Sequence, residues 1–123
     1  MSAVPCFVGI DVAKAQLDIA LRPSGERWAV PNDASGVTTL VDRLQDRPPT
    51  LIVLEATGGL ERAVTSALAT AGLPVVVVNP WQVRDVARAT GQLATTDALD
   101  AHALAHCADV IRPTPRPLPE AQT

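Results

Sequence analysis

The chain has 123 residues, which is enough for one domain and too short for two. Hydrophobic residues make up 47% and charged residues 19%, so we expect a sizeable core and no disorder over most of the length. The net charge of −3 neither supports nor excludes a nucleic-acid partner, and the longest apolar run, Leu73–Val78, is far too short to span a membrane.

The cysteines and the N-terminus indicate a cellular compartment. Cys6 and Cys107 lie in apolar stretches, which favours buried thiols in a reducing cytoplasm over a disulfide. The N-terminus lacks the features of a signal peptide. Arginine is preferred over lysine, and alanine and proline are abundant, which is typical of a GC-rich bacterial gene. We expect a cytoplasmic bacterial protein.

The first part of the chain predicts three short strands. Residues Cys6–Val12 form an apolar run, Leu17–Leu21 alternates between apolar and polar residues, and Arg27–Val30 follows the Ser24-Gly25 turn. Because the links between these strands are short, we expect an antiparallel meander.

The second part alternates between helices and strands. The expected elements are helix Ser35–Leu44, strand Leu51–Leu54, helix Leu60–Ala71, strand Val75–Val78, helix Pro80–Arg88 and helix Asp97–Ile111. The fold class is therefore α/β, with a mixed sheet of three antiparallel strands then two parallel strands, and helices on both faces. We expect this domain to span residues 1–111. The proline-rich residues 112–123 form an extended tail or linker.

Four acidic residues interrupt apolar elements. Asp11 and Glu55 each follow a very apolar strand, where ligands gather in α/β sheets. Asp97 and Asp100 are three residues apart at the start of a predicted helix, and the helical wheel places them on the face shared by Leu104, Cys107 and Ile111. Four convergent carboxylates suit Mg²⁺ or Mn²⁺ and the two-metal chemistry of phosphodiesters.

Each acid also has a purely local explanation. Asp97 can be a helix N-cap with Asp100 as its capping-box partner, Asp11 can cap a turn, and Glu55 can pair with an arginine. A coincidence of four such explanations is a weaker hypothesis than one metal site.

These residues resemble the N-terminal domain of DEDD insertion-sequence transposases, the bridge-RNA-guided recombinases with a RuvC-like, RNase H-like fold. The matching stretches cover nearly the whole chain: Val8–Lys14 with Leu17-Asp18, Leu54–Gly59, Val78–Arg84, Ala87–Gly91 and Thr96–Ala101. One departure is Thr95, because the family often has a lysine before the Thr-Asp pair. If that lysine touches phosphate, the contact is lost here.

The resemblance implies a metal-binding quartet of Asp11, Glu55, Asp97 and Asp100, with DNA and a guide RNA as partners. We also expect a homo-oligomer. A separate C-terminal domain supplies a serine nucleophile in this family, so we expect the 123 residues to be an incomplete transposase that does not transpose alone. The other hypotheses are an ATP-dependent phosphotransferase domain and a non-catalytic dimerising or inhibitory fragment.

Several other residues are open to two interpretations. Lys14 and the pair Arg84 and Arg88 can bind phosphate or simply lie on a solvated surface, and Gly58-Gly59 can approach nucleic acid or only form a turn. The wheel turns His102, His106 and Asp109 away from the four acids, so we expect both histidines to be exposed to solvent.

Overall fold

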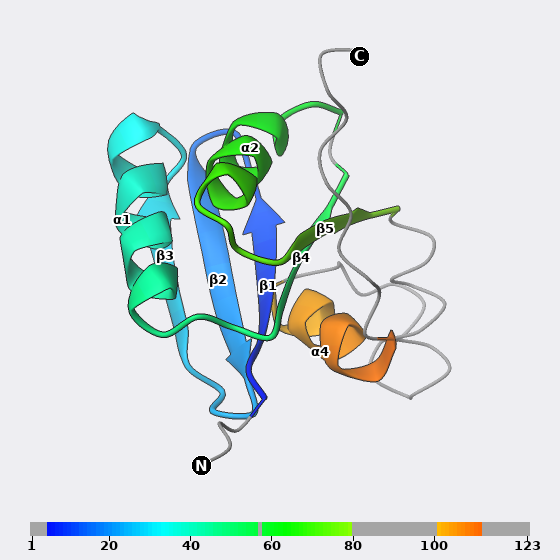
Figure 1. Ribbon diagram of the computed structural model, residues 1–123. Helices are drawn as coiled ribbons and strands as arrows, with labels where there is room; N and C mark the ends of the chain where they lie inside the picture. The colour runs from blue at the N-terminus through cyan, green and yellow to red at the C-terminus, as the bar shows by residue number, and fades with distance from the viewer. Residues whose placement is uncertain (1–4, 57, 80–100, 112–123) are drawn as a thin grey trace.

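The computed structural model describes residues 5–56, 58–79 and 101–111 (Figure 1). Its elements are β1 (Phe7–Val12), β2 (Gln16–Arg22), β3 (Arg27–Pro31), α1 (Ala34–Asp46), β4 (Leu51–Glu55), α2 (Arg62–Thr70), β5 (Val75–Val78) and α4 (Ala101–Ile111). The predicted helix Pro80–Arg88 and the tail 112–123 lie outside the described residues. Among those residues, no helix has the length and apolarity needed to cross a membrane.

The five strands form one mixed sheet in the order β3-β2-β1-β4-β5. The first three strands pair antiparallel, while β4 and β5 run parallel to β1. The central strand β1 therefore pairs with β2 on one side and with β4 on the other. The predicted mixed sheet and its strand directions are confirmed.

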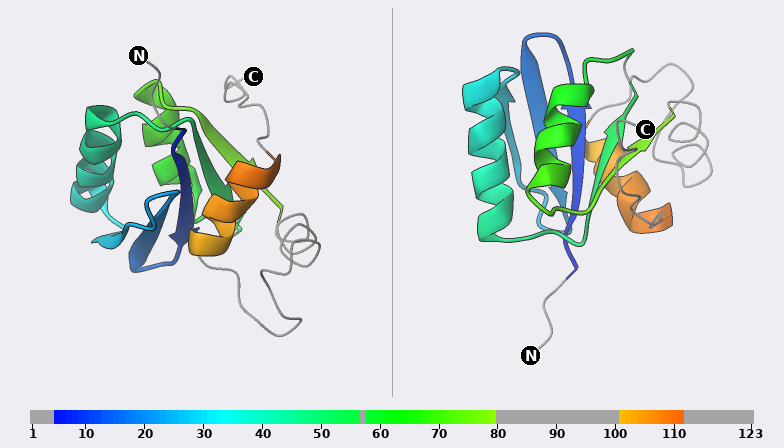
Figure 2. Two further views of the ribbon diagram at one scale, coloured as in Figure 1. Left: turned by 90° about the horizontal axis from the view of Figure 1, so that it is seen from below. Right: turned by 45° about the horizontal axis from the view of Figure 1, so that its top comes forward.

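Helices cover both faces of the sheet, as expected (Figure 2). Alternate residues of β1 and β4 point to opposite faces, because successive side chains of a strand do so. Val8 and Ile10 join the core beneath α1 and α2, whereas Phe7 joins a second core beneath α4 with Val53 and Leu104. Both strands are thus buried on two sides, which explains their continuous apolar sequence.

Helix α1 is longer than the predicted Ser35–Leu44 at both ends. It begins after Asp33, whose carboxylate Oδ1 accepts a hydrogen bond from the Gly36 backbone N–H at 2.8 Å. This contact satisfies one of the N–H groups that every helix leaves free at its start. The observed boundary is therefore set by the cap, which precedes the periodic apolar residues.

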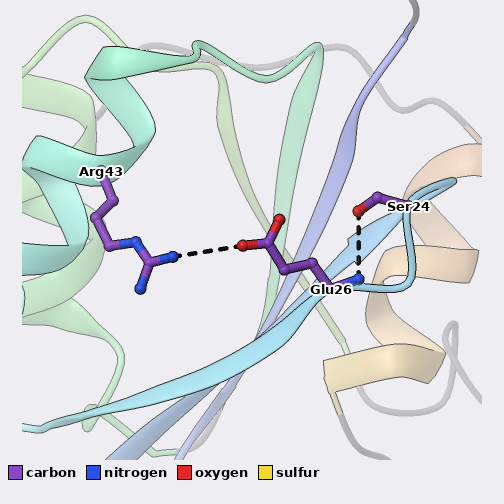
Figure 3. Close-up of polar contacts among 3 residues, drawn as sticks. All are labelled: Ser24, Glu26 and Arg43. Atoms are coloured by element: carbon purple, nitrogen blue, oxygen red, sulfur yellow. Dashed lines mark hydrogen bonds and ion pairs between the residues drawn. The ribbon is translucent and has the colours of Figure 1, made fainter.

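An aromatic and ionic cluster attaches α1 to the edge strand β3 and to the turn before it. Figure 3 shows its ionic part, in which Arg43 meets Glu26 beside Ser24. The Arg43 guanidinium lies over the Trp28 ring, 3.9 Å from its centroid, and its Nη2 is 3.4 Å from Glu26 Oε2. The backbone N–H of Glu26 donates to Ser24 Oγ at 3.2 Å in the preceding turn. These contacts lie on the face of β3 that is turned toward α1, opposite the face beneath α4.

Helix α4 lies close against β1 at Gly9. A side-chain carbon at Gly9 would overlap the backbone of Ala101 and Ala105, so only glycine permits this approach. The small residues Ala101, Ala105 and Ala108 are buried here beside Leu104. The predicted sheet-facing stripe is right for Leu104, but it omits the alanines, which the close approach to Gly9 admits beside it.

Two further predictions for this helix are wrong. His106 is only 7% exposed, where exposure to solvent was expected. Asp109 is not turned away from the sheet, since its Oδ2 is 3.2 Å from Nε of Arg22 on β2. Both errors share a cause, because the contact face of α4 is rotated toward Ala101 and Ala105 relative to the predicted face. The side chains of His102 and Cys107 lie outside the described set.

Candidate functional site

Asp11 and Glu55 lie side by side at the carboxyl ends of two adjacent parallel strands. Ile10 of β1 pairs with Leu54 of β4, and each acid is the next residue of its strand. Ordinary strand spacing puts their backbones about 4.8 Å apart. By alternation both acids belong to the face covered by α4, because Gly9 and Val53, two residues earlier, lie on that face.

Both carboxylates lie at the boundary between the buried sheet and the surface. Asp11 and Glu55 are half-buried, and the Oε2 atom of Glu55 is shielded from solvent. Two adjacent carboxylates repel one another, and burial strengthens the repulsion because it removes screening water. Such a pair suits a bound cation.

Asp18 is a third acid in the same row, and sequence reasoning missed it as a site residue. The hairpin register places Asp18 of β2 directly opposite Asp11. The amide Nε2 of Gln16 donates to Asp18 Oδ1 at 2.8 Å and holds this carboxylate from one side. The available signal was the pairing outward from the tight turn, in which Val12 meets Leu17 and the next pair is Asp11 with Asp18.

A surface pocket of about 380 Å³ opens beside Asp11. Asp18, Arg27 and Ala29 line it from β2 and β3, and Ala101 lines it from the first turn of α4. The pocket therefore joins one of the predicted site residues to the start of the helix that follows Asp100. Asp97 and Asp100 themselves lie outside the described residues, so their part in the site stays a prediction.

The remaining predicted residues lie around this end of the sheet or outside the described residues. Lys14 is exposed in the turn between β1 and β2, at the end of the strand that carries Asp11. Gly58 and Gly59 have positive φ angles of 76° and 116°, which identifies a tight strand-to-helix turn after Glu55. Arg84 and Arg88 are not among the described residues.

The donor set at Asp11 and Glu55 fits a hard divalent cation. Mg²⁺ and Mn²⁺ take oxygen ligands, and Mg²⁺ typically uses one or two carboxylates and keeps several waters. Across the described ranges, no group of three or more His, Cys, Asp or Glu side chains is arranged to hold a metal. A complete centre at this edge therefore requires ligands beyond the two strands.

Cys6 lies at the opposite end of β1 and belongs to different surroundings. It is a free thiol with a half-buried side chain, just before the first strand. Burial raises the pKa of this thiol, the nearby positive charge of Arg47 opposes the rise, and Glu26 adds to it. Cys6 precedes β1, whereas Asp11 lies near the carboxyl end of that strand, so this thiol is not a candidate ligand of the site.

Two solved structures of RuvC from Thermus thermophilus share this fold. The RuvC in complex with Holliday junction substrate has a TM-score of 0.60 and 18% sequence identity, over 94% of this chain and 100% of that chain. A second RuvC structure has a TM-score of 0.50 and 20% identity, over 92% and 84% of the two chains. The fold is thus RuvC-like, with the RNase H-like architecture expected from the sequence.

Sequence comparison identifies the family. No curated protein matches the chain at a significant level. The profile of the DEDD family of IS110 type, described as "Transposase", matches residues 8–123. This match includes the strands that carry Asp11 and Glu55 and continues through α4. The chain therefore belongs to the DEDD transposase family of IS110 type.

Proposed function

We propose that this chain is the metal-dependent catalytic domain of a bacterial DNA transposase that acts on phosphodiester bonds. Asp11, Glu55, Asp97 and Asp100 hold Mg²⁺ or Mn²⁺ in this proposal. One observation carries it: Asp11 and Glu55 are neighbours at the carboxyl ends of the parallel strands β1 and β4, on the face beneath α4.

The position of α4 supports the assignment of the other two acids. Ala101 packs over Gly9 and lines the pocket beside Asp11, and Asp100 is bonded directly to Ala101. Asp97 precedes Asp100 by three residues, which is the spacing of one helical face. The tight fit between Gly9 and the backbone of Ala101 and Ala105 holds the start of α4 close to the strand that carries Asp11.

The residues of the site have separate tasks in this proposal. A bound pair of divalent ions would activate the nucleophile and stabilise the leaving oxygen. The carboxylates orient the ions, and exposed Lys14 binds a phosphate at the end of β1. Arg84 and Arg88 are proposed contacts for DNA or guide RNA. A separate domain supplies the serine nucleophile, so that the 123 residues alone bind metal without transposing.

DNA is the proposed substrate for two reasons. The chain belongs to a family of transposases, and a RuvC of the same fold was solved with a Holliday junction substrate. Guide RNA and a homo-oligomer are included in the proposal on the family resemblance alone.

Mn²⁺ titration by calorimetry tests the metal site. We expect Asp11→Asn and Glu55→Gln each to weaken Mn²⁺ binding by about tenfold or more, because each removes a charged ligand. Asp42→Asn is the matched control, since Asp42 is exposed on α1 away from the row. Circular dichroism verifies that each variant is folded. Equal Mn²⁺ affinity in the wild type and both site variants would contradict the proposal.

A further inference from the structure

The pocket beside Asp11 is also lined by two charged residues, Asp18 and Arg27, that are not among the proposed metal ligands. Asp11 of β1 and Ala101 of α4 line it together with Asp18 of β2 and Ala29 and Arg27 of β3. Helix α4 packs on β1, β2 and β4 (Figure 2). The pocket lies beside its first residue, Ala101, and extends to β3 through Arg27 and Ala29.

The strand register fixes the face on which Arg27 lies. Arg27 pairs with Ala20 of β2, and the Ala20 side chain packs against Ala101 and Ala105 of α4. Cross-strand partners share a face, so Arg27 is on the same face as the helix and the carboxylates. Arg27 is exposed. Ala29, two positions later on β3 and opposite Asp18, has only a methyl side chain and so leaves space between Arg27 and Asp18.

We propose that this pocket receives the sugar–phosphate backbone of the DNA strand and that Arg27 binds a phosphate beside the reacting one. The inference rests on the proposed metal site, because the carboxylates of Asp11 and Asp18 repel an anion unless a cation neutralises them. Arginine suits the task because its planar guanidinium forms paired hydrogen bonds to phosphate oxygens.

Sheet geometry explains why the contact is to a neighbouring phosphate. Arg27 is two strands away from Asp11 and level with Gly9, two residues back toward the start of β1, so the backbones of Arg27 and Asp11 are about 12 Å apart. One phosphate next to the metal ligands and a second at Arg27 would align the strand across β1, β2 and β3. Arg27 is thus a positioning residue for substrate and does not touch the reacting atoms.

The test measures binding of a fluorescein-labelled single-stranded DNA to the 123-residue chain by fluorescence anisotropy, over a NaCl series in saturating Mn²⁺. We expect Arg27→Gln to weaken binding by about tenfold and to lower the slope of log K against log salt by about 0.7 to 1. Arg27→Lys retains a positive charge and should keep the slope while losing part of the affinity.

The control is Arg47→Gln, which removes the same charge from an exposed residue beside Cys6, at the other end of β1. It should change neither the slope nor the affinity. The inference is overturned if Arg27→Gln binds like the wild type, if Arg47→Gln has an equal effect, or if the wild type binds no DNA in Mn²⁺. Mn²⁺ affinity is measured separately in each variant. If the metal site is wrong, Asp11→Asn binds Mn²⁺ as tightly as the wild type. If only the Arg27 contact is wrong, Asp11→Asn still binds Mn²⁺ more weakly while Arg27→Gln binds DNA like the wild type.

Discussion

Gly9 is the residue on which the arrangement of the site depends most, although it carries no functional group. It lies two positions before Asp11, beneath the first turn of α4. The absence of a side chain lets backbone atoms of Ala101 and Ala105 approach β1. The distance between the sheet and the helix that follows Asp100 is therefore set by a glycine.

We predict that Gly9→Ala lowers the free energy of unfolding by about 3 kcal/mol, because the added methyl overlaps backbone that cannot rotate away. Urea unfolding measures the change. Gly25→Ala provides the comparison, since Gly25 has a positive φ of 79° but no heavy atom within 4 Å of the added carbon. Backbone strain alone should cost about 1 kcal/mol there. Equal losses in the two variants would show that the close contact with α4 is unimportant.

At the level of elements, helix α1 is held at its start by Asp33 and near its end by Arg43. Asp33 caps the first turn, whereas Arg43 packs on Trp28 of β3 and pairs with Glu26, the residue before β3. These contacts stabilise α1 and its packing on the edge strand, on the face of the sheet opposite Asp11 and Glu55. Changes in α1 should consequently alter stability without altering metal binding.

We predict that Asp33→Ala costs about 1 kcal/mol of unfolding free energy, because the Gly36 N–H loses its acceptor. Asp33→Ser should recover most of the loss, since serine is an equally good N-cap. Urea titration measures stability and Mn²⁺ calorimetry measures the site. A variant that retained full stability, or that lost metal affinity in proportion to stability, would refute this separation.

Sequence patterns predicted the elements well and their contacts less well. Apolar runs such as Leu51–Leu54 identify buried strands, and the meander followed by alternating helices specifies the mixed sheet. The juxtaposition of Asp11 and Glu55 followed from the strand-end rule. The start of α1 was placed too late because a polar cap, not an apolar residue, defines it.

The alanine contacts of α4 and the position of Asp18 opposite Asp11 depend on pairs of elements and were not predicted. A helical wheel favours the largest apolar residues, and Leu104 is buried as predicted, but Gly9 on the opposing strand also admits the alanines. Asp18 looks like an ordinary outward residue of an alternating strand until its hairpin partner is known to be Asp11. Both errors arise because one element alone does not reveal the residues that face it.

For the whole molecule, metal binding and folding should be linked. A ligand that binds only the folded state stabilises it by about 2.7 kcal/mol when its concentration is 100 times Kd. We therefore predict that Mn²⁺ at this excess raises the Tm of the wild type by about 10 °C. Asp11→Asn should show a much smaller increase. Differential scanning calorimetry checks this, and the same increase in both proteins would indicate non-specific binding.

The position of β1 in the sheet has a consequence for how the molecule opens. Backbone amides of β1 are paired on both sides, whereas β3 and β5 each have one strand neighbour among the described residues. Hydrogen exchange should therefore be slowest at β1 and β4, which carry Asp11 and Glu55, and faster at β3, which carries Arg27. If the proposed function holds, the side of the pocket formed by β1 would keep the shape of the metal site, while the side formed by β3 would open locally and adjust to different DNA strands.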